Sequence, residues 1–422
     1  MDANTGNYSS SLLVFMQMDG VISKIFPTFS IEKNLHFCGV KLRDPSTVLL
    51  AGNGGTSEFG HQYLLKWETG EFKKIAGGKI ANCHDMMWAY DGDATWQPGS
   101  SSEGTIELRN ASTGRKISVT KLEPYAKDVN HAQPIEQDSV VIASSRLTNA
   151  VIKANVNAGE VKWVAGGEYG EFEMHTLKGE TKAAGENMFV GQHNAEYFGE
   201  NEYMMFDNNY KTGNTSRLLI VKIDVDNMRM TELWEYINAP YPWGYTPYFG
   251  DNDRLPTGNL LGCFWPYKLS GKEYEEVDYE ARAIEIVRDT KETAWKMDVY
   301  GRNSCSEHVC TRQSAEGWKM YSIERFYVAP LVYNVTCATD DATNAIFFNT
   351  INNFKQNDQY EGTYKLKNDD GSLVVEGDFN YLAHWRSTPV SFQFDSTEND
   401  SNEYVLSVKN QWGDETPHSV TC

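Results

Sequence analysis

Three histidines occur within short polar motifs that resemble one another. The motifs are Asn82-Cys83-His84-Asp85, Val129-Asn130-His131-Ala132 and Gly191-Gln192-His193-Asn194. A neutral imidazole is a nucleophile and proton carrier near neutral pH, so these side chains are candidates for group-transfer chemistry. Three imidazoles would also suit a transition metal such as Zn, Cu or Fe, although no local pair of ligand residues accompanies them. The structural alternative, a hydrogen bond to neighbouring backbone, is open for each and strongest for His84.

The pattern around these motifs predicts many strands and little helix. Short apolar runs alternate with Gly, Asn and Asp turns, which is typical of an all-β chain. Four segments repeat a strand, a tight polar turn and a second strand; they begin near Tyr63, Arg146, Arg217 and Ala283. Repeats of about 40–60 residues built from short strands are typical of a β-propeller, whose innermost strands face a central channel. The sequence therefore predicts a propeller of about six blades over residues 1–335, with five or seven also open.

The pattern changes near Cys337. Four period-two runs follow, separated by turns such as Asp369-Asp370-Gly371. Runs of this kind, in a segment of this length, predict a small immunoglobulin-like β-sandwich over residues 336–422. We expect this domain to serve packing or assembly rather than catalysis.

Several of these motifs resemble the arylsulfotransferase family. The resemblance covers roughly residues 80 to 330 and rests on these segments: Asp128-Val129-Asn130-His131, Ile142-Ala143-Ser144-Ser145-Arg146, Glu160-Val161-Lys162-Trp163, Gln192-His193-Asn194-Ala195, Phe206-Asp207-Asn208, Ser216-Arg217, Lys222-Ile223-Asp224, Leu233-Trp234-Glu235-Tyr236 and Asp253-Arg254-Leu255-Pro256-Thr257-Gly258-Asn259. It implies a six-bladed propeller that moves a sulfuryl group between phenols without a nucleotide donor. It also implies a channel histidine that is transiently sulfated, while other histidines and an arginine hold the sulfuryl oxygens.

The resemblance carries roles to individual residues. His131 and His193 match its motif histidines and would bind the sulfuryl group or act as acid and base. Arg217 would clamp the anion, as would Arg146 in the equivalent copy, because guanidinium offers a planar fork of donors. Both arginines could equally brace strand edges. Lys211 is the only cation close to Phe206-Asp207-Asn208, where the family has an arginine, and His84 completes the expected substrate site.

The chain departs from the family at the nucleophile. The family's reactive histidine comes from the blade after His193, yet the segment from Trp243 to Lys268 contains no histidine. His308 lies in the next suitable loop and His84 faces the channel from another blade, but neither matches the motif. The fold could therefore persist with the reaction lost or altered.

Composition limits the partners. The chain has 422 residues, 40% of them hydrophobic and 23% charged, and its 38 basic and 58 acidic residues give a net charge of −20. Such a charge repels phosphate backbones and anionic bilayers, so we expect no nucleic-acid partner. No run reaches the roughly 18 apolar residues of a membrane helix, so we expect no membrane span.

Cysteines and sequons predict an extracellular or cell-surface glycoprotein. The expected disulfides are Cys305–Cys310, Cys337–Cys422 and Cys38–Cys83, leaving Cys263 free; seven reduced thiols are the alternative. Five Asn-X-Ser/Thr sequons lie at Asn7, Asn110, Asn214, Asn334 and Asn399. Residues 1–20 lack a signal-peptide pattern, so we expect a leader removed before the numbering or a sequence incomplete at its start.

The sequence leaves two hypotheses about function open. One is an enzyme of the arylsulfotransferase type that binds a small phenol or sulfate ester and needs no cofactor. The other is a non-catalytic extracellular glycoprotein, in which propeller and sandwich serve ligand binding, protein partners or self-assembly. Metal-dependent chemistry in the channel is a third and weaker alternative.

Overall fold

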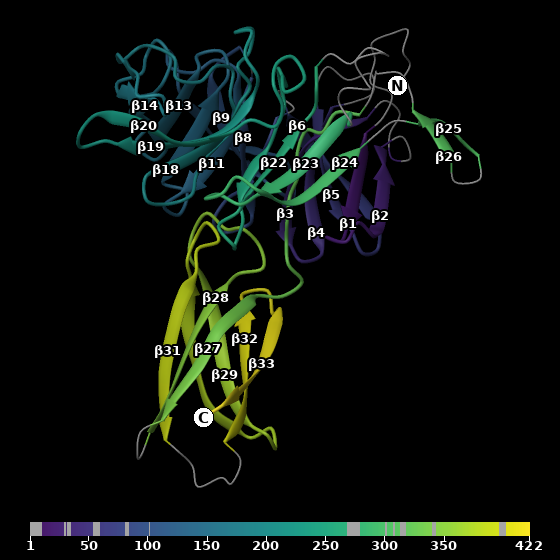
Figure 1. Cartoon of the computed structure of the whole chain (residues 1–422), viewed down its shortest axis with the longest axis vertical. Helices are drawn as coiled ribbons and strands as arrows, with labels where there is room; N and C mark the ends of the chain where they lie inside the picture. Colours follow the sequence, from purple (N-terminus) through teal and green to yellow (C-terminus); the bar gives the residue numbers. More distant parts are fainter. Residues whose placement is uncertain are drawn as a thin grey trace. The chain divides into compact units, whose positions relative to one another are not determined.

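The computed structural model describes residues 11–28, 31, 35–53, 60–80, 84–100, 102–267, 279–299, 302–306, 309–312, 318–339, 343–395 and 402–422. Within these ranges every regular element is a β-strand (Figure 1), which confirms the predicted all-β class. The chain forms two compact units. Unit 1 comprises residues 1–253 and 258–324, and unit 2 comprises residues 254–257 and 325–422.

Unit 1 contains a series of four-stranded antiparallel sheets, each built from strands consecutive in the chain. In chain order the sheets are β3 (His36–Asp44), β4 (Thr47–Asn53), β5 (Gly60–Lys66), β6 (Glu71–Ile80); β7 (Met87–Trp88), β8 (Ala94–Pro98), β9 (Thr105–Asn110), β10 (Lys116–Lys121); β11 (Val129–Ile135), β12 (Val140–Ser145), β13 (Ala150–Asn155), β14 (Glu160–Ala165); β17 (His193–Tyr197), β18 (Glu202–Asp207), β19 (Arg217–Asp224), β20 (Arg229–Tyr236); and β21 (Asn252–Arg254), β22 (Leu260–Phe264), β23 (Ala281–Ile286), β24 (Thr293–Val299). The fourth sheet also carries β15 (Glu173–His175) and β16 (Thr181–Lys182). Two hairpins complete the described part, β1 (Leu12–Met16) with β2 (Ile22–Pro27) and β25 (Arg302–Ser306) with β26 (Val309–Arg312).

The first strand of each sheet lies toward a common axis. Strand β3 contacts β7, β7 contacts β11, and β11 contacts β17. Side-chain amides then join β17 to β21, since Asn252 Nδ2 donates to the Asn194 carbonyl at 3.2 Å. Sheets arranged with their first strands around one axis form a β-propeller. The described residues of unit 1 contain five such sheets, four of them with four strands and one with six, so a count of six blades stays a prediction.

The predicted repeats coincide with the outer strands of the sheets. The four repeated segments are β5–β6, β13–β14, β19–β20 and β23–β24, the third and fourth strands of four sheets. Between neighbouring sheets lie apolar clusters, one of which joins Ile142 and Val151 to Leu219. Each such side chain contributes about 1.5–3 kcal/mol on burial, so these layers set where the first strands lie.

Unit 2 contains two antiparallel sheets. Their strand orders are β27-β28-β31 and β30-β29-β32-β33, with β27 (Leu331–Thr339), β28 (Thr343–Ile351), β29 (Tyr360–Asn368), β30 (Leu373–Tyr381), β31 (Thr388–Asp395), β32 (Glu403–Asn410) and β33 (Glu415–Thr421). One apolar cluster unites Ile346 and Phe392 of the first sheet with Leu366 and Leu406 of the second. A sequence boundary after residue 335 remains a prediction; the compact unit begins at Arg325.

The Cys337–Cys422 disulfide is present and joins β27 to the last residue. Cys38 also takes part in a disulfide, while Cys263 is free and buried. Cys83 and the side chains of Cys305 and Cys310 lie outside the described residues, so those two pairings stay predictions; in the backbone, residues 305 and 310 face each other across β25 and β26.

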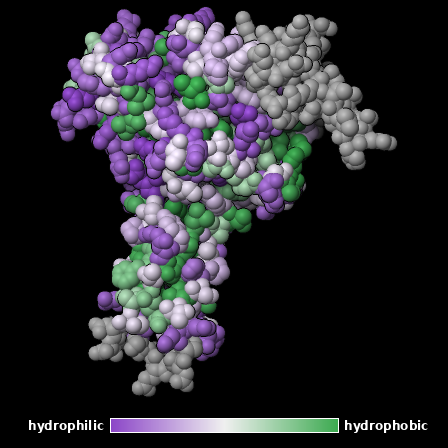
Figure 2. Space-filling view, viewed as in Figure 1, coloured by the Kyte–Doolittle hydropathy of each residue, from purple (hydrophilic) through white to green (hydrophobic). Residues whose placement is uncertain are grey.

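The described sequons differ in their surroundings. Asn214 and Asn334 are exposed. The Asn110 side-chain oxygen instead accepts hydrogen bonds from Ser112 and Thr113 within a turn. Asn7 and Asn399 lie outside the described residues. Hydrophilic residues cover most of the face of unit 1 seen in Figure 2, and no helix in the described ranges is long and apolar enough to cross a bilayer.

Candidate functional site

The chemically competent side chains of unit 1 come from equivalent points of its sheets. His84 and Asp85 lie two to three residues before β7, His131 lies in β11, His193 begins β17, and Asp251 immediately precedes β21. Because these are the first strands of their sheets, they place these side chains around the propeller axis. The histidine register seen in the sequence thus corresponds to positions at or near the start of the first strand in three sheets.

Polar neighbours in the motifs hold these strands together. The Asn130 amide donates to the Gln192 carbonyl at 2.7 Å, joining β11 to the residue before β17. The Gln192 amide donates to the Ala150 carbonyl at 2.9 Å. Both side chains are almost fully buried, so their hydrogen bonds fix the inner strands in place of water.

One amide orients the ring of His193. His193 Nδ1 lies 2.8 Å from Asn208 Oδ1. The Asn208 amide nitrogen donates to the carbonyls of Thr246 and Phe249 at 2.8 and 2.9 Å. Since both amide hydrogens are used on carbonyls, Oδ1 can only accept, and Nδ1 of the ring carries the hydrogen. In the neutral ring the lone pair therefore lies on Nε2.

His84 and His193 form a neutral pair. Their ring centres lie 6.0 Å apart. Burial, with added effects of His84 and Arg146, lowers the pKa of His193 to about 3. Burial also lowers the pKa of His84 to about 4, where Asp128 raises it and Arg146 lowers it. Both imidazoles are thus unprotonated near neutral pH.

Arg146 is the cation next to this pair. Its Nε donates to Asp128 Oδ2 at 2.7 Å, and its guanidinium lies 5.3 Å from the ring centre of Tyr210. Its two terminal nitrogens have no hydrogen-bond partner among the described residues. The side chain is 22% exposed, so these nitrogens can meet an anion that reaches the histidines.

His131 occupies a different electrostatic setting, which we call the buried charge network: Lys41, Asp85, His131, Glu196 and Glu324. His131 Nδ1 lies 3.0 Å from Asp85 Oδ2, and its Nε2 lies 3.6 Å from Glu196 Oε1. Lys41 pairs with Asp85 at 3.3 Å and also with Glu324. Burial raises the pKa of Asp85, but Lys41 and the hydrogen bond from His131 outweigh it and bring it to about 2. Asp85 is therefore an anion that accepts the Nδ1 hydrogen.

A segment without regular structure, residues 318–324, adds a group that the sequence did not single out. The Tyr321 ring centre lies 6.5 Å from that of His84. Asp251 Oδ2 accepts hydrogen bonds from the Ser322 hydroxyl at 2.6 Å and the Ile323 amide at 3.0 Å. Burial raises the pKa of Tyr321 well above its usual value, and nearby Asp85 raises it further, so the phenol keeps its proton. Nothing in the strand pattern marks this segment, and no sequence signal pointed to it.

Part of the chain is similar to known proteins. Residues 128–308 match the sequence model of a family described as Arylsulfotransferase (ASST). The resemblance to arylsulfotransferases is confirmed. No curated protein matches the chain. Among solved structures, a 6-phosphogluconolactonase candidate from Bacteroides uniformis aligns with a TM-score of 0.40 at 13% identity, over 69% of this chain and 80% of its own. The β-propeller domain of Cps50 (Swd1) from Myceliophteria thermophila aligns with a TM-score of 0.37 at 7% identity, over 68% and 89%.

The matched segment, residues 128–308, includes His131, His193, Arg146, Lys211 and Arg217, whereas His84 precedes it. Lys211 is exposed, and its ammonium lies 5.0 Å from the ring centre of Tyr210, the ring that Arg146 also approaches. His308 lies outside the described residues.

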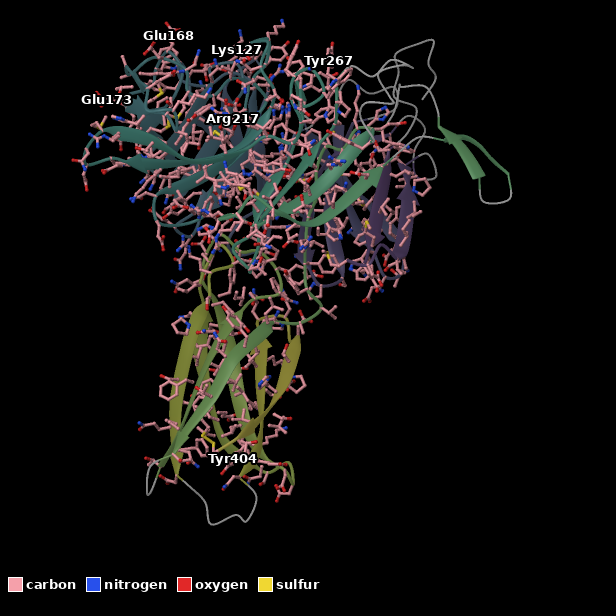
Figure 3. The ribbon with its side chains drawn as sticks, in the orientation of Figure 1. Lys127, Glu168, Glu173, Arg217, Tyr267 and Tyr404 are labelled. Atoms are coloured by element: carbon pink, nitrogen blue, oxygen red, sulfur yellow. A yellow bond between two sulfur atoms is a disulfide. The ribbon has the colours of Figure 1, made fainter. Side chains whose placement is uncertain are left out.

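Arg217, within the matched segment, is surrounded by acceptors of its own sheet. Its guanidinium pairs with Asp207 at 2.9 Å, and with Glu232 and Glu235 at 2.8 Å each. It also donates to the Met188 carbonyl at 3.0 Å. These contacts tie β18, β19 and β20 together, as the alternative of a strand-edge brace would require (Figure 3 labels Arg217). An anion clamp at Arg217 stays untested, and the site described above does not need it.

The described residues contain no group of three or more His, Cys, Asp or Glu side chains placed to hold a metal ion. His84 and His193 face each other as a pair, and His131 faces carboxylates. The arrangement supplies a lone pair, a nearby cation and a second neutral imidazole, which together suit transfer of an anionic group.

Proposed function

We propose that this protein transfers a sulfuryl group from an aryl sulfate to a phenol at the neutral pair, with His193 as the nucleophile. The observation that carries the proposal is the hydrogen bond from His193 Nδ1 to Asn208 Oδ1. It leaves Nε2 with a lone pair in a ring whose low pKa keeps it neutral. His193 would thus take the place of the reactive histidine that the family carries one blade later.

In the first step, the Nε2 lone pair forms a bond to sulfur while the bond from sulfur to the aryl oxygen breaks. The departing phenolate takes that electron pair and then a proton from water. In the second step, an acceptor phenol loses its proton, attacks sulfur and restores the neutral ring of His193. Over the two steps atoms and charge balance, because the donor's oxygen gains one proton from water and the acceptor phenol releases one.

The side chains around His193 would each have a role in these two steps. Arg146 would hold sulfuryl oxygens with its terminal nitrogens, a planar fork suited to such anions. His84 would take the acceptor's proton in the second step and release it to water, since an anion bound beside it raises its pKa and makes it a better base. Tyr321 would offer a hydrogen bond to the aryl oxygen. His131 would act indirectly, by fixing the inner strands through the buried charge network.

The test is turnover of a chromogenic aryl sulfate with a phenol acceptor, after removal of metals and again after their return. We expect phenol release that requires acceptor and is unchanged by metal. Intact-mass measurement after a rapid quench should show one added sulfuryl group in wild type and none in His193→Asn. A sulfated intermediate in His193→Asn would assign the nucleophile elsewhere, and no turnover by a folded sample would overturn the proposal.

A second candidate is a non-catalytic extracellular glycoprotein. The exposed sequons at Asn214 and Asn334 and the Cys337–Cys422 disulfide support an oxidising compartment. Expression in secreting cells, followed by glycosidase treatment, tests this: a loss of mass at Asn214 or Asn334 supports a glycoprotein. Assembly through unit 2 stays a prediction, tested by the oligomeric state of unit 2 alone and of the full chain.

A further inference from the structure

The hairpin of β1 and β2 is apolar on both of its sides. On one side Leu13, Phe15 and Phe26 pack into the apolar cluster of the first sheet. The Phe15 ring stacks there on Trp67, with 5.0 Å between ring centres. The other side and the turn, which we call the open face, are exposed to solvent. Six apolar side chains of the open face are each 39–54% exposed: Leu12, Val14, Met18, Val21, Ile22 and Ile25.

The open face is one continuous patch. Val14 pairs with Ile25 across the two strands, so their side chains are neighbours on the same face. Leu12 lies two residues before Val14 and therefore shares that face. Among the described strands, this sheet contains only β1 and β2. Figure 2 shows hydrophobic surface at the place where Figure 1 draws these two strands.

The size of the open face suits the apolar centre of a protein interface. Its six side chains present roughly 450–500 Å² of apolar surface, within the range of about 300–600 Å² for the largest patch of a soluble monomer. A standard interface buries about 800 Å² per partner, and about 56–65% of that area is apolar. The apolar share is thus about 450–520 Å², so the open face supplies the apolar part of one side of a stable dimer.

Charge favours a second copy of this chain over a lipid bilayer as the occupant. Residues 11–28 contain one acidic residue, Asp19, and one basic residue, Lys24, in a chain with a net charge of −20. Two copies of so acidic a protein repel each other least where they meet through a neutral surface. Proteins that rest on a bilayer anchor themselves with exposed aromatic and basic side chains. Here the rings of Phe15 and Phe26 point into the first sheet, and the Lys24 ammonium donates to the Glu68 carbonyl.

We propose that two copies of the protein associate through the open face about a twofold axis, so that β1 and β2 of one copy pack on those of the other. Such an arrangement uses the same patch on both copies and needs no other apolar surface. The hairpin also contacts the fifth sheet, because the Trp295 indole of β24 donates to the Met18 carbonyl at 2.8 Å. Since Phe15 packs on the first sheet, the hairpin joins the first sheet to the fifth. Association stabilises this junction, and it requires no part of the proposed chemistry.

The oligomeric state of the full chain tests the proposal. Sedimentation velocity between about 0.5 and 50 µM covers the range in which a micromolar dissociation constant is resolved. We expect dimers at the upper end of this range and a melting temperature that rises with protein concentration. A monomer throughout the range would overturn the proposal. A monomer that also pellets with phosphatidylcholine vesicles would overturn it by assigning the open face to a bilayer.

Variants locate the contact. Val14→Lys and Ile25→Lys each bring like charges together across the twofold axis and should raise the dissociation constant at least about 100-fold. Ile25→Thr keeps a β-branched residue in the strand and should raise it about tenfold. The matched controls are Ile117→Lys and Val119→Lys, which replace side chains of β10 that are 56% and 44% exposed; both should dimerise as wild type does.

Circular dichroism of each variant verifies that it is folded before its mass is compared. Dimers that persist in both Val14→Lys and Ile25→Lys would place the contact elsewhere, unit 2 included, and contradict the proposal. Dimers lost equally in the β10 controls would contradict it too, because added charge anywhere on unit 1 would then be enough to separate the copies.

Discussion

The neutral pair and the buried charge network place histidines from the same structural register in opposite surroundings. His193 gives its Nδ1 hydrogen to the amide oxygen of Asn208, whereas His131 gives its own to the carboxylate of Asp85. An amide oxygen accepts a hydrogen bond without adding charge, so burial dominates and the ring of His193 stays neutral. A carboxylate instead ties its histidine into an ionic network with Lys41. The partner of each histidine, more than its motif, decides whether it is available for chemistry.

The largest expected effect on turnover comes from replacing the proposed nucleophile, His193. His193→Asn should reduce aryl sulfate turnover by at least about 10³-fold, the scale on which loss of a covalent nucleophile acts. It should leave the melting temperature nearly unchanged, because the smaller amide can still donate to Asn208. His175→Asn, on β15 with its ring paired with Glu173, is the control and should keep full activity. Comparable turnover in the two variants would remove His193 from the reaction.

The buried charge network should respond in stability rather than rate. Lys41→Met removes the cation shared by Asp85 and Glu324. Leaving buried carboxylates without their partner costs about 3–5 kcal/mol, which urea denaturation would measure. Lys222→Met, exposed on β19, should change the free energy of unfolding by less than about 0.5 kcal/mol. An unchanged stability in Lys41→Met would mean that the network contributes little to folding.

Two arginines in matching Ser-Arg-Leu segments give the next contrast. Arg146→Lys keeps the charge but loses the planar fork, so we expect turnover to fall about 10²-fold. Arg217→Lys should instead lower stability, since it weakens the contacts to Asp207, Glu232 and Glu235. Paired assays of turnover and thermal unfolding separate the two roles. A larger rate loss for Arg217→Lys would restore Arg217 as the anion clamp.

The smallest effect concerns pH. The pKa values of His84 and His193 are lowered to about 4 and about 3, so the neutral forms persist as pH falls. The acid limb of kcat/KM should therefore lie near pH 4 rather than near the ordinary histidine value of about 6.5.

Arg146 lowers the pKa of both rings, whereas Asp128 and Asp85 raise that of His84. In Arg146→Gln both values should rise, and the acid limb should move upward by up to about one pH unit. An acid limb near pH 6.5 in wild type would contradict a neutral pair set by burial.

The sequence predicted where the three histidines lie in their sheets better than it predicted what their side chains contact. The motifs around His84, His131 and His193 were enough to place three histidines at or just before first strands, because the repeat unit has a recognisable beginning. Which of them meets an amide and which a carboxylate depends on Asn208 and Asp85 in neighbouring loops, and no local pattern encodes that pairing.

Local sequence also could not predict the surroundings of Arg146 and Arg217, or the role of residues 318–324, which form no strand. Arg146 and Arg217 are equivalent in sequence, but the carboxylates around Arg217 meet it only after β19 and β20 pair. Tyr321 lies outside any strand, so periodicity carries no information about it. The all-β class was predictable because alternation and turn residues are local, whereas the blade count depends on how many repeats close the ring.

The disulfide at the end of unit 2 has a mechanical consequence. The bond from Cys422 to Cys337 reaches back across 85 positions of sequence to β27. A pulling force applied at Cys422 passes through that covalent bond directly into β27, so the strands between the two cysteines carry no tension. Under load, only the few residues of β27 before Cys337 could peel away, and unit 2 would behave as a stiff, nearly inextensible link.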